Sequence, residues 1–304
     1  MAGLKELRTH LSAVKSTQKM TTAMKLVAAA KLKKATSAIE TNKPYAMLIE
    51  HAVARVLLEY QKEKIKNPKV RHILPAVFQT KPNPKNYLLI VFSSERGLCG
   101  SYNQNVAKAA ARRLRDLIGQ GKSVSLVCYG KKAYDILKKN HKDKIIFHEP
   151  SFASGGIFYD EAVQMFDKLK AFISDGHTDV CEIVCSHSLS ALHADISSIQ
   201  VFPLLKEDIV VDDGLDHVGS AYFDYKDSQE DILQKASEKL VFNRIFEAML
   251  SAQVAEQSAR MAAMENATDN AKKMIEELTL KYNTLRQSAI TTELTEIISG
   301  AEAI

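Results

Sequence analysis

The feature that most restricts the fold is a run of 80 residues, between Gly219 and Gly300, that contains neither glycine nor proline. The run is rich in Ala, Glu, Lys, Met and Leu, which are strong helix formers, so it predicts one very long helix. At 1.5 Å per residue, a fully helical run of this length spans about 120 Å, several times the width of a small domain. A single globular core cannot cover such a helix. Most of it must therefore pack on another helix or inside another protein.

The N-terminal segment supplies a helical partner, because neither breaker occurs between Gly3 and Pro44. An alternating step of three and four residues marks a helix face with apolar ends and a polar middle, typical of an imperfect coiled-coil seam. A second seam, with a mean step of about 3.7 residues, follows alanines through the C-terminal run. Because a domain separates the two segments, we expect them to pair antiparallel. The N-terminal seam comprises Leu4, Leu7, Leu11, Val14, Gln18, Thr21, Lys25, Ala28, Leu32, Ala35 and Ile39, and the C-terminal seam comprises Ala252, Ala255, Ala259, Ala263, Ala267, Ala271, Met274, Leu278, Tyr282, Leu285 and Ala289.

The middle of the chain alternates short apolar strands with helices, which predicts βαβ units and a mostly parallel sheet covered on both faces, as in Rossmann-like domains. The whole chain is thus of the α/β class, with a long antiparallel coiled coil added to a central domain. The predicted parts are an N-terminal coiled-coil helix at 1–61, an exposed linker with four prolines at 62–86, the α/β domain at 87–205, and at 206–304 a segment leading into the long C-terminal helix. The predicted strands are 87–93, 123–129, 144–148, 180–186 and 199–204, and the predicted helices between them are 105–118, 131–139 and 160–173.

The charge is distributed unevenly along the chain. Residues 1–80 carry a net charge of +10, residues 81–205 a net +4, and residues 206–304 a net −9, which sum to the overall +5. A basic first segment and an acidic last segment attract each other when they lie side by side. Binding of nucleic acid would also explain the basic segment, but an acidic partner within the same chain argues against that interpretation.

No group of residues in the chain predicts catalysis. The turn 95–100 (ERGLCG) follows the first strand, where nucleotide-binding folds place their phosphate loops. It matches neither G-x-G-x-x-G nor the Walker loop, because the third glycine and the Gly-Lys-Ser/Thr sequence are missing. Ser186 and His187 are adjacent on a strand and point to opposite faces, and no G-x-S-x-G elbow is present. The histidines and cysteines have no metal-binding spacing, so we expect no cofactor and no metal.

Three blocks of the sequence resemble the gamma subunit of F-type ATP synthases. They are HLSAVKSTQKMTTAMKLVAAAKLKKA (10–35), SSERGLCGSYN (93–103) and SARMAAMENATDNAKKMIEELTLKYNTLRQSAITTELTEIISGAEA (258–303). The blocks follow the family's order and spacing and together span the chain from end to end. The segment SHSLSALHADISSIQVFPLL (186–205) departs from the family, which commonly has an Asn-Lys-Phe type sequence there.

The resemblance implies a non-catalytic rotor. In that family the terminal helices form a shaft along the axis of a hexamer of alternating alpha and beta subunits. The α/β domain contacts the epsilon-type subunit and the membrane ring of c subunits. Rotation of the ring, driven by protons, turns the shaft and changes the beta-subunit sites in sequence, which also regulates ATP hydrolysis and proton flow. The implied partners are thus the alpha and beta subunits, the epsilon-type subunit and the c-ring, with no nucleic acid and with membrane attachment only through the complex.

The resemblance also implies roles for individual residues. Coupling and beta-subunit contact are expected at Met24, Arg260, Arg286, Gln287, Thr291 and Glu296. A bearing surface at the tip is expected at Ile290, Leu294, Ile297 and Ile298. A foot on the c-ring and the epsilon-type subunit is expected at Tyr222, Phe223, Tyr225 and Lys226, where the family often has an acid in place of Lys226.

Two other functions stay open at this point. One is a coiled-coil protein with a nucleotide-binding α/β domain, and the other is a basic coiled coil that binds nucleic acid or another acidic surface. The family pattern begins within a few residues of Met1, so we expect no transit peptide. This favours the cytoplasmic face of a bacterial inner membrane over the alternative, the matrix side of the mitochondrial inner membrane.

Overall fold

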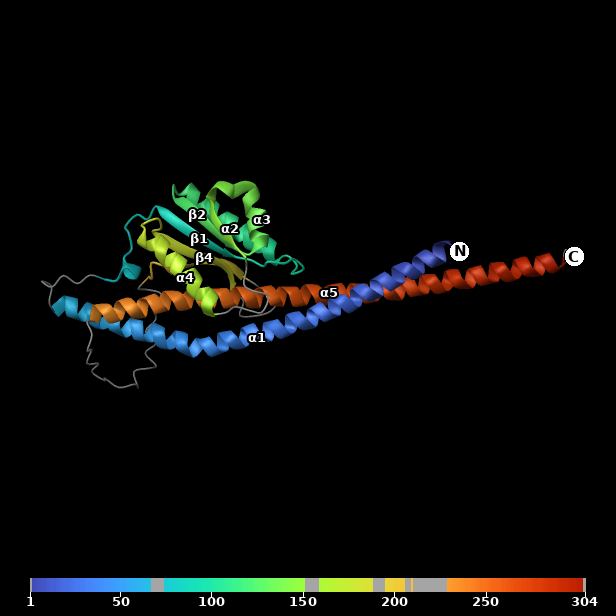
Figure 1. Cartoon of the computed structure of the whole chain (residues 1–304), viewed down its shortest axis with the longest axis horizontal. Helices are drawn as coiled ribbons and strands as arrows, with labels where there is room; N and C mark the ends of the chain where they lie inside the picture. The colour runs from blue at the N-terminus through green and yellow to red at the C-terminus, as the bar shows by residue number, and fades with distance from the viewer. Residues whose placement is uncertain are drawn as a thin grey trace. The chain divides into compact units, whose positions relative to one another are not determined.

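The computed structural model describes residues 2–66, 74–150, 159–187, 195–205, 209 and 229–302. Two helices are exceptionally long: α1 spans Ala2–Lys66 and α5 spans Gln229–Glu302 (Figure 1). The chain divides into two compact units. One contains residues 1–30, 98–100 and 258–304, and the other contains residues 31–97 and 101–257, so each long helix contributes to both units.

The second unit is built on a five-stranded sheet with the order β3-β2-β1-β4-β5. The strands β1 to β4 are parallel, whereas β5 runs antiparallel to β4 at one edge. The mostly parallel Rossmann-like sheet predicted from the sequence is thereby confirmed. The strands are β1 (Asn86–Phe92), β2 (Ser123–Tyr129), β3 (Ile145–Glu149), β4 (Val180–His187) and β5 (Asp195–Phe202), and the helices between them are α2 (Tyr102–Gly119), α3 (Lys131–His141) and α4 (Tyr159–Ser174).

Successive side chains of each strand point to opposite faces of the sheet, so a buried layer of side chains forms on each face. Leu88, Ile90 and Phe92 of β1 belong to a core that also includes residues of α4 and of the two long helices. The helices α2 and α3 are in contact with each other and cover the opposite face, on the other side of the sheet from α4 (Figure 1). This arrangement follows from right-handed crossovers, which place successive connections in one direction on the same face.

The structure corrects several boundaries. The last strand begins at Asp195, four residues before the predicted 199, and it ends at Phe202. The segment 62–86 is not wholly an exposed linker, since residues 62–66 still belong to α1 and Val77 and Phe78 are buried. A proline, Pro44, lies inside α1, and its side chain is exposed.

A partly buried ion pair joins α2 to the sheet. Arg113 donates from Nε to Glu182 Oε2 (2.7 Å) and from a terminal nitrogen to Oε1 (2.5 Å). The Glu182 side chain on β4 is only 5% exposed, so its charge depends on this bidentate partner. Glu182 lies between Leu89 of β1 and Gln200 of β5 in the ladder.

We expect Arg113→Ala to destabilise the chain by about 3 kcal/mol, because it leaves the Glu182 carboxylate buried without its partner. The double variant Arg113→Met/Glu182→Leu should cost less than the single one, since no buried charge remains. Urea unfolding followed by circular dichroism measures both. Equal losses in the single and double variants would contradict this interpretation of the pair.

Candidate functional site on the long helices

A polar layer joins α1 and α5 in the first unit. The hydroxyl groups of Thr21 and Thr268 are hydrogen-bonded at 2.8 Å, and Lys25 Nζ lies 2.5 Å from Glu265 Oε1. Buried apolar side chains lie on either side of this layer: Val14 and Ala28 on α1, and Met264 and Ala271 on α5. Since a polar layer within an apolar seam is stable only in one alignment, these contacts fix the register of the two helices.

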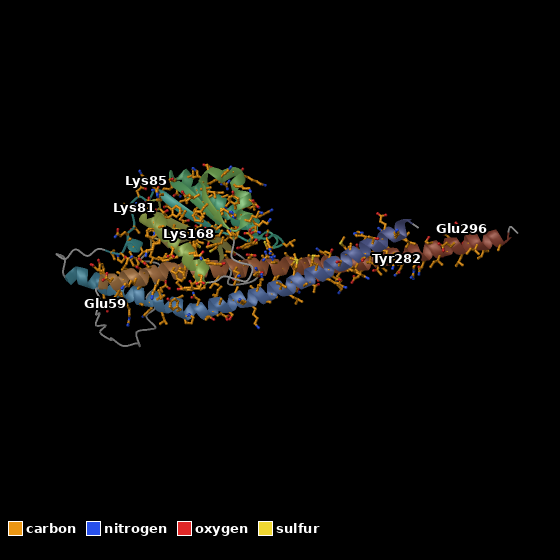
Figure 2. All side chains as sticks on the ribbon, viewed as in Figure 1. Glu59, Lys81, Lys85, Lys168, Tyr282 and Glu296 are labelled. Atoms are coloured by element: carbon orange, nitrogen blue, oxygen red, sulfur yellow. The ribbon has the colours of Figure 1, made fainter. Side chains whose placement is uncertain are left out.

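The same contacts show that the helices run antiparallel. Thr21 pairs with Thr268, and Lys25, four residues later on α1, pairs with Glu265, which is three residues earlier on α5. Continuing this register to Ala2 places the start of α1 opposite about residue 287 of α5, given equal rise per residue. The last turns of α5 therefore extend past α1, and Glu296 lies on this stretch (Figure 2).

All the N-terminal seam positions predicted from the sequence are buried or half-buried. The C-terminal seam is confirmed except at Met274 and Leu285, which are 47% and 44% exposed. At Met274 the seam takes a step of four residues from Ala271 to the half-buried Ile275, in place of the predicted step of three. Leu285 lies opposite the first turn of α1, where little of that helix covers it.

The extension of α5 has an unusually apolar surface. Ile290, Leu294, Ile297 and Ile298 are each between 48% and 68% exposed. The hydroxyl of Thr291 donates to the carbonyl of Gln287 at 3.0 Å, and Thr292 and Thr295 bond to their own backbone in the same way. Their hydroxyl groups are thus satisfied within the helix, which leaves methyl groups outward. Exposed apolar surface of this kind marks a contact with another molecule.

The structure brings only some of the predicted coupling residues together. At 100° per residue, Arg286 lies on the same side of α5 as Ile290 and Ile297, and Gln287 and Thr291 lie on an adjacent stripe. That stripe continues through Leu294 and Ile298. Glu296 lies about 80° around the helix from Arg286 and on the side opposite Gln287 and Thr291.

Two further predicted residues form a separate group. Met24 and Arg260 are both half-buried, on α1 and α5 of the first unit. Met24 lies opposite about residue 265 of α5, so Arg286 is roughly 30 Å farther along that helix. The predicted coupling residues are therefore distributed along a rod and do not form one pocket. The predicted foot residues Tyr222, Phe223, Tyr225 and Lys226 lie outside the described residues.

Sequence reasoning did not find the pairings Thr21–Thr268 and Lys25–Glu265. The N-terminal seam already contained Thr21 and Lys25, and its polar middle required polar partners on the other helix. The sequence does not identify these partners, because the predicted C-terminal seam follows alanines, whereas Glu265 and Thr268 lie beside it.

The second unit contains another polar cluster between the long helices. Asn42 donates to Asn243 (3.0 Å), and Arg244 donates to Glu50 (3.2 Å). Glu247 lies among these groups, and burial raises the pKa of its carboxyl, with a further increase from the charge of Glu50. Arg244 and hydrogen bonds from Asn243 and Asn42 offset part of this increase. The ionised form of Glu247 is therefore a source of instability at neutral pH.

Polar groups of the turn after β1 make hydrogen bonds within the protein. Ser94 N donates to Asn103 Oδ1 at 3.0 Å, and both residues are buried. Glu95 Oε2 accepts from the backbone N–H of Lys131 at the start of α3 at 3.2 Å. A cluster of three side chains able to hold a metal is also missing from the described residues.

Comparisons with known proteins agree with this architecture. The family model described as ATP synthase matches residues 3–304. The chain is similar to the ATP synthase gamma chains of Maricaulis maris (37% identical over 306 residues) and Rhizorhabdus wittichii (38% over 305 residues), with full coverage of each chain. The chain therefore belongs to the family of ATP synthase gamma chains. It is a structural subunit of that complex and not its catalytic one.

Solved structures support the fold. A central-stalk chain of the Tetrahymena thermophila mitochondrial ATP synthase superposes with a TM-score of 0.57 at 22% identity, covering 82% of this chain and 99% of that one. A chain of the Euglena gracilis mitochondrial enzyme gives a TM-score of 0.52 at 19% identity, covering 90% and 95%. Within the described residues, the helices lack a stretch long and apolar enough to cross a lipid bilayer.

We expect Glu247→Gln to raise the thermal midpoint at pH 7, because it removes an unfavourable charge at a half-buried position. A carboxyl whose pKa is raised on folding lowers stability above its folded pKa, and the penalty disappears as the pH falls to the unfolded pKa of about 4.3. The gain should therefore vanish near pH 4. Differential scanning calorimetry of the full chain measures it, with the exposed Glu276→Gln as the matched control. A lower midpoint for Glu247→Gln at pH 7 would refute the prediction.

Proposed function

We propose that this chain is the rotating central-stalk subunit of a proton-translocating ATP synthase and couples rotation of a c-ring to conformational changes at catalytic beta subunits. The observation that carries the proposal is the extension of α5 beyond the start of α1, with exposed isoleucine and leucine side chains. A helix in water gains nothing from such a surface. Inside a narrow apolar sleeve of alpha and beta subunits, the same surface acts as a bearing.

The pairing of α1 and α5 supports the transmission of torque. Seam contacts, a hydrogen bond and an ion pair hold the two helices in one register, so that twisting one helix turns the other. The continuous backbone hydrogen bonding of α5 resists sharp bending. A two-helix rod is stiffer than a single helix, and this stiffness suits a shaft.

Coupling requires that the shaft contact each beta subunit differently. A ligand shifts a conformational equilibrium only by its difference in affinity for the states, and a rotor side chain acts in the same way. We assign beta-subunit contact to Arg286, Gln287 and Thr291, whose stripes on α5 are exposed. We assign positions along the shaft to Met24, Arg260 and Glu296. Because Glu296 lies on the side of α5 opposite Gln287 and Thr291, it would meet a different subunit from them at any one angle.

The proposed base of the rotor contacts the c-ring and an epsilon-type subunit. The resemblance to the family assigns this contact to Tyr222, Phe223, Tyr225 and Lys226. The titles of the superposed Tetrahymena and Euglena structures name central stalk and c-ring, or F1 and c-ring, in those complexes. Through these contacts the subunit would also influence the rates of ATP hydrolysis and proton flow.

The proposed location is the cytoplasmic face of a bacterial inner membrane, with attachment through the complex. Full-length similarity to gamma chains from Maricaulis and Rhizorhabdus favours this location over the mitochondrial matrix.

Met24→Lys should uncouple rotation from catalysis, because it places a second charge beside Lys25 at a half-buried position of the shaft. In vesicles containing the complete synthase, ATP hydrolysis should persist while proton pumping per ATP hydrolysed falls. Met20→Lys is the matched control, since Met20 is 61% exposed one turn away on the same helix. The assigned role of Met24 would be contradicted if proton pumping and ATP hydrolysis fell together, or if neither fell.

Truncation after Ala289 should leave the sheet unit folded, because the removed end of α5 lies beyond the start of α1. Limited proteolysis should release the same protected fragment as in the full chain. In the assembled complex, rotation against a viscous load should slow, since the bearing residues are gone. Full torque in the truncated rotor would contradict the assignment of the tip.

A further inference from the structure

The outer sides of α2 and α3 carry a dense group of basic residues. The two helices pack against each other on one face of the sheet, so their outer sides form one continuous surface. The group has seven members, of which six have exposed side chains and one, Lys132, is half-buried. We name this surface the basic face; it comprises Lys108, Arg112 and Arg115 of α2, Lys131, Lys132 and Lys139 of α3, and Lys142, which directly follows α3.

The protein neutralises this surface only in part, by the carboxylates of Asp135 and Glu95 near Lys131. None of the seven residues forms an ion pair with a carboxylate in the part of the chain that the structure describes. Two nearby carboxylates are already engaged, Asp135 by Lys138 at 2.6 Å and Asp143 by Lys144 at 3.3 Å. The positive charge of the basic face is therefore available to a partner outside the chain.

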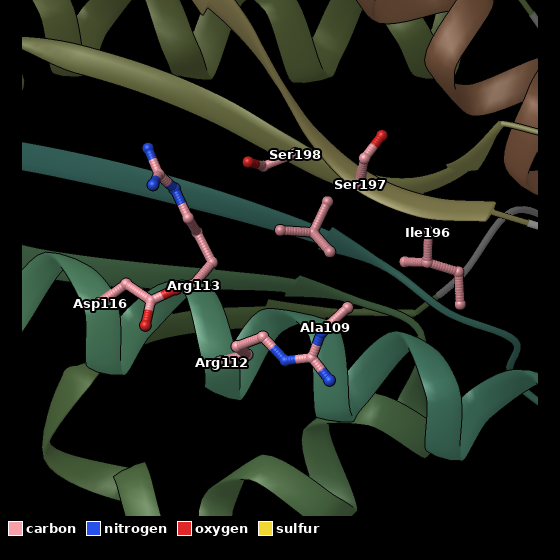
Figure 3. A pocket seen from close by; sticks show the side chains of 8 residues that line it. Ala109, Arg112, Arg113, Asp116, Ile196, Ser197 and Ser198 are labelled. Atoms are coloured by element: carbon pink, nitrogen blue, oxygen red, sulfur yellow. The ribbon is translucent and has the colours of Figure 1, made fainter.

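The pocket at the margin of this surface does not select an anion. It has a volume of about 150 Å³ and lies between α2 and the edge strand β5, with Arg112, Arg113 and Ser198 in its wall (Figure 3). Asp116 also lines it, and Arg113 is bound to Glu182. Arg113 is thus already paired, and the Asp116 carboxylate adds negative charge to the same wall. The excess charge lies on the open surface of the helices and not in this cavity.

We propose that the basic face docks on the anionic surface of a lipid bilayer. Five of its seven residues are lysines, which protein–protein interfaces disfavour and which suit a diffuse layer of phosphate headgroups. Ile136 is 38% exposed between Lys132 and Lys139, and Ile118 is 44% exposed one turn after Arg115. Basic residues interspersed with apolar ones are typical of surfaces that lie on a membrane. The proposal concerns the unassembled subunit and does not depend on the rotor function.

The test is binding of the full chain to vesicles of phosphatidylcholine with phosphatidylglycerol, compared with phosphatidylcholine alone. We expect binding only to the anionic vesicles and its loss at high salt. The variant Lys131→Gln/Lys139→Gln/Lys142→Gln should weaken binding on the order of 100-fold, because each basic side chain near an anionic leaflet contributes about fivefold. Circular dichroism verifies that the variant is folded.

The matched control is Lys33→Gln/Lys34→Gln/Lys43→Gln, which removes the same charge from exposed positions on α1. It should retain most of the binding. Equal weakening by both variants would overturn the proposal in favour of general charge attraction. Failure to bind anionic vesicles would also overturn it, as would release from the vesicles by duplex DNA at equal phosphate concentration, which would favour nucleic acid.

Discussion

The structure depends on the pairing of α1 with α5. A helix of 74 residues has far more surface than one domain can cover, and isolated helices gain little stability from propensity alone. Pairing supplies the missing burial through small residues such as Ala28 and Ala271, which let the two backbones approach closely. The seam of small residues also keeps the rod slender. The polar layer at Thr21 and Lys25 adds what alanines cannot supply, a single register.

The sheet unit shows how a nucleotide-type fold can serve as a rigid body. In the turn after β1, the backbone N–H of Ser94 donates to Asn103, and Glu95 accepts from the backbone N–H at the start of α3. On the other face of the sheet, α4 and the long helices pack on β1. Residues 53–60 of α1 and 233–252 of α5 contribute to this one core, which joins the sheet to the helix pair. Tyr102 strengthens this joint by donating its hydroxyl to the carbonyl of Ala252 at 3.2 Å.

Periodicity predicted the long helices, the seam on α1 and the mostly parallel α/β sheet, because each reflects a local pattern repeated many times. Periodicity predicted the wrong seam residue at Met274. A step of three residues from Ala271 and a step of four residues both lead to an apolar side chain, so the pattern does not choose between them. It also failed at Val77 and Phe78, since prolines nearby indicated a linker and only tertiary contact reveals their burial. The partners of Thr21 and Lys25 depend on the alignment of two distant segments, which a single sequence does not specify. The roles of Arg286 and Gln287 came from resemblance and remain predictions.

The central claim is that α1 and α5 turn together as one shaft. A disulfide between cysteines introduced at Thr21 and Thr268, whose hydroxyl groups are 2.8 Å apart, tests it directly in the assembled synthase. The four native cysteines are buried and leave the introduced pair as the reactive one. The account predicts that oxidation leaves ATP hydrolysis and proton pumping unchanged, because locked helices already move as a unit. Loss of activity on oxidation, restored by a reductant, would show that the two helices must move against each other and would contradict the account.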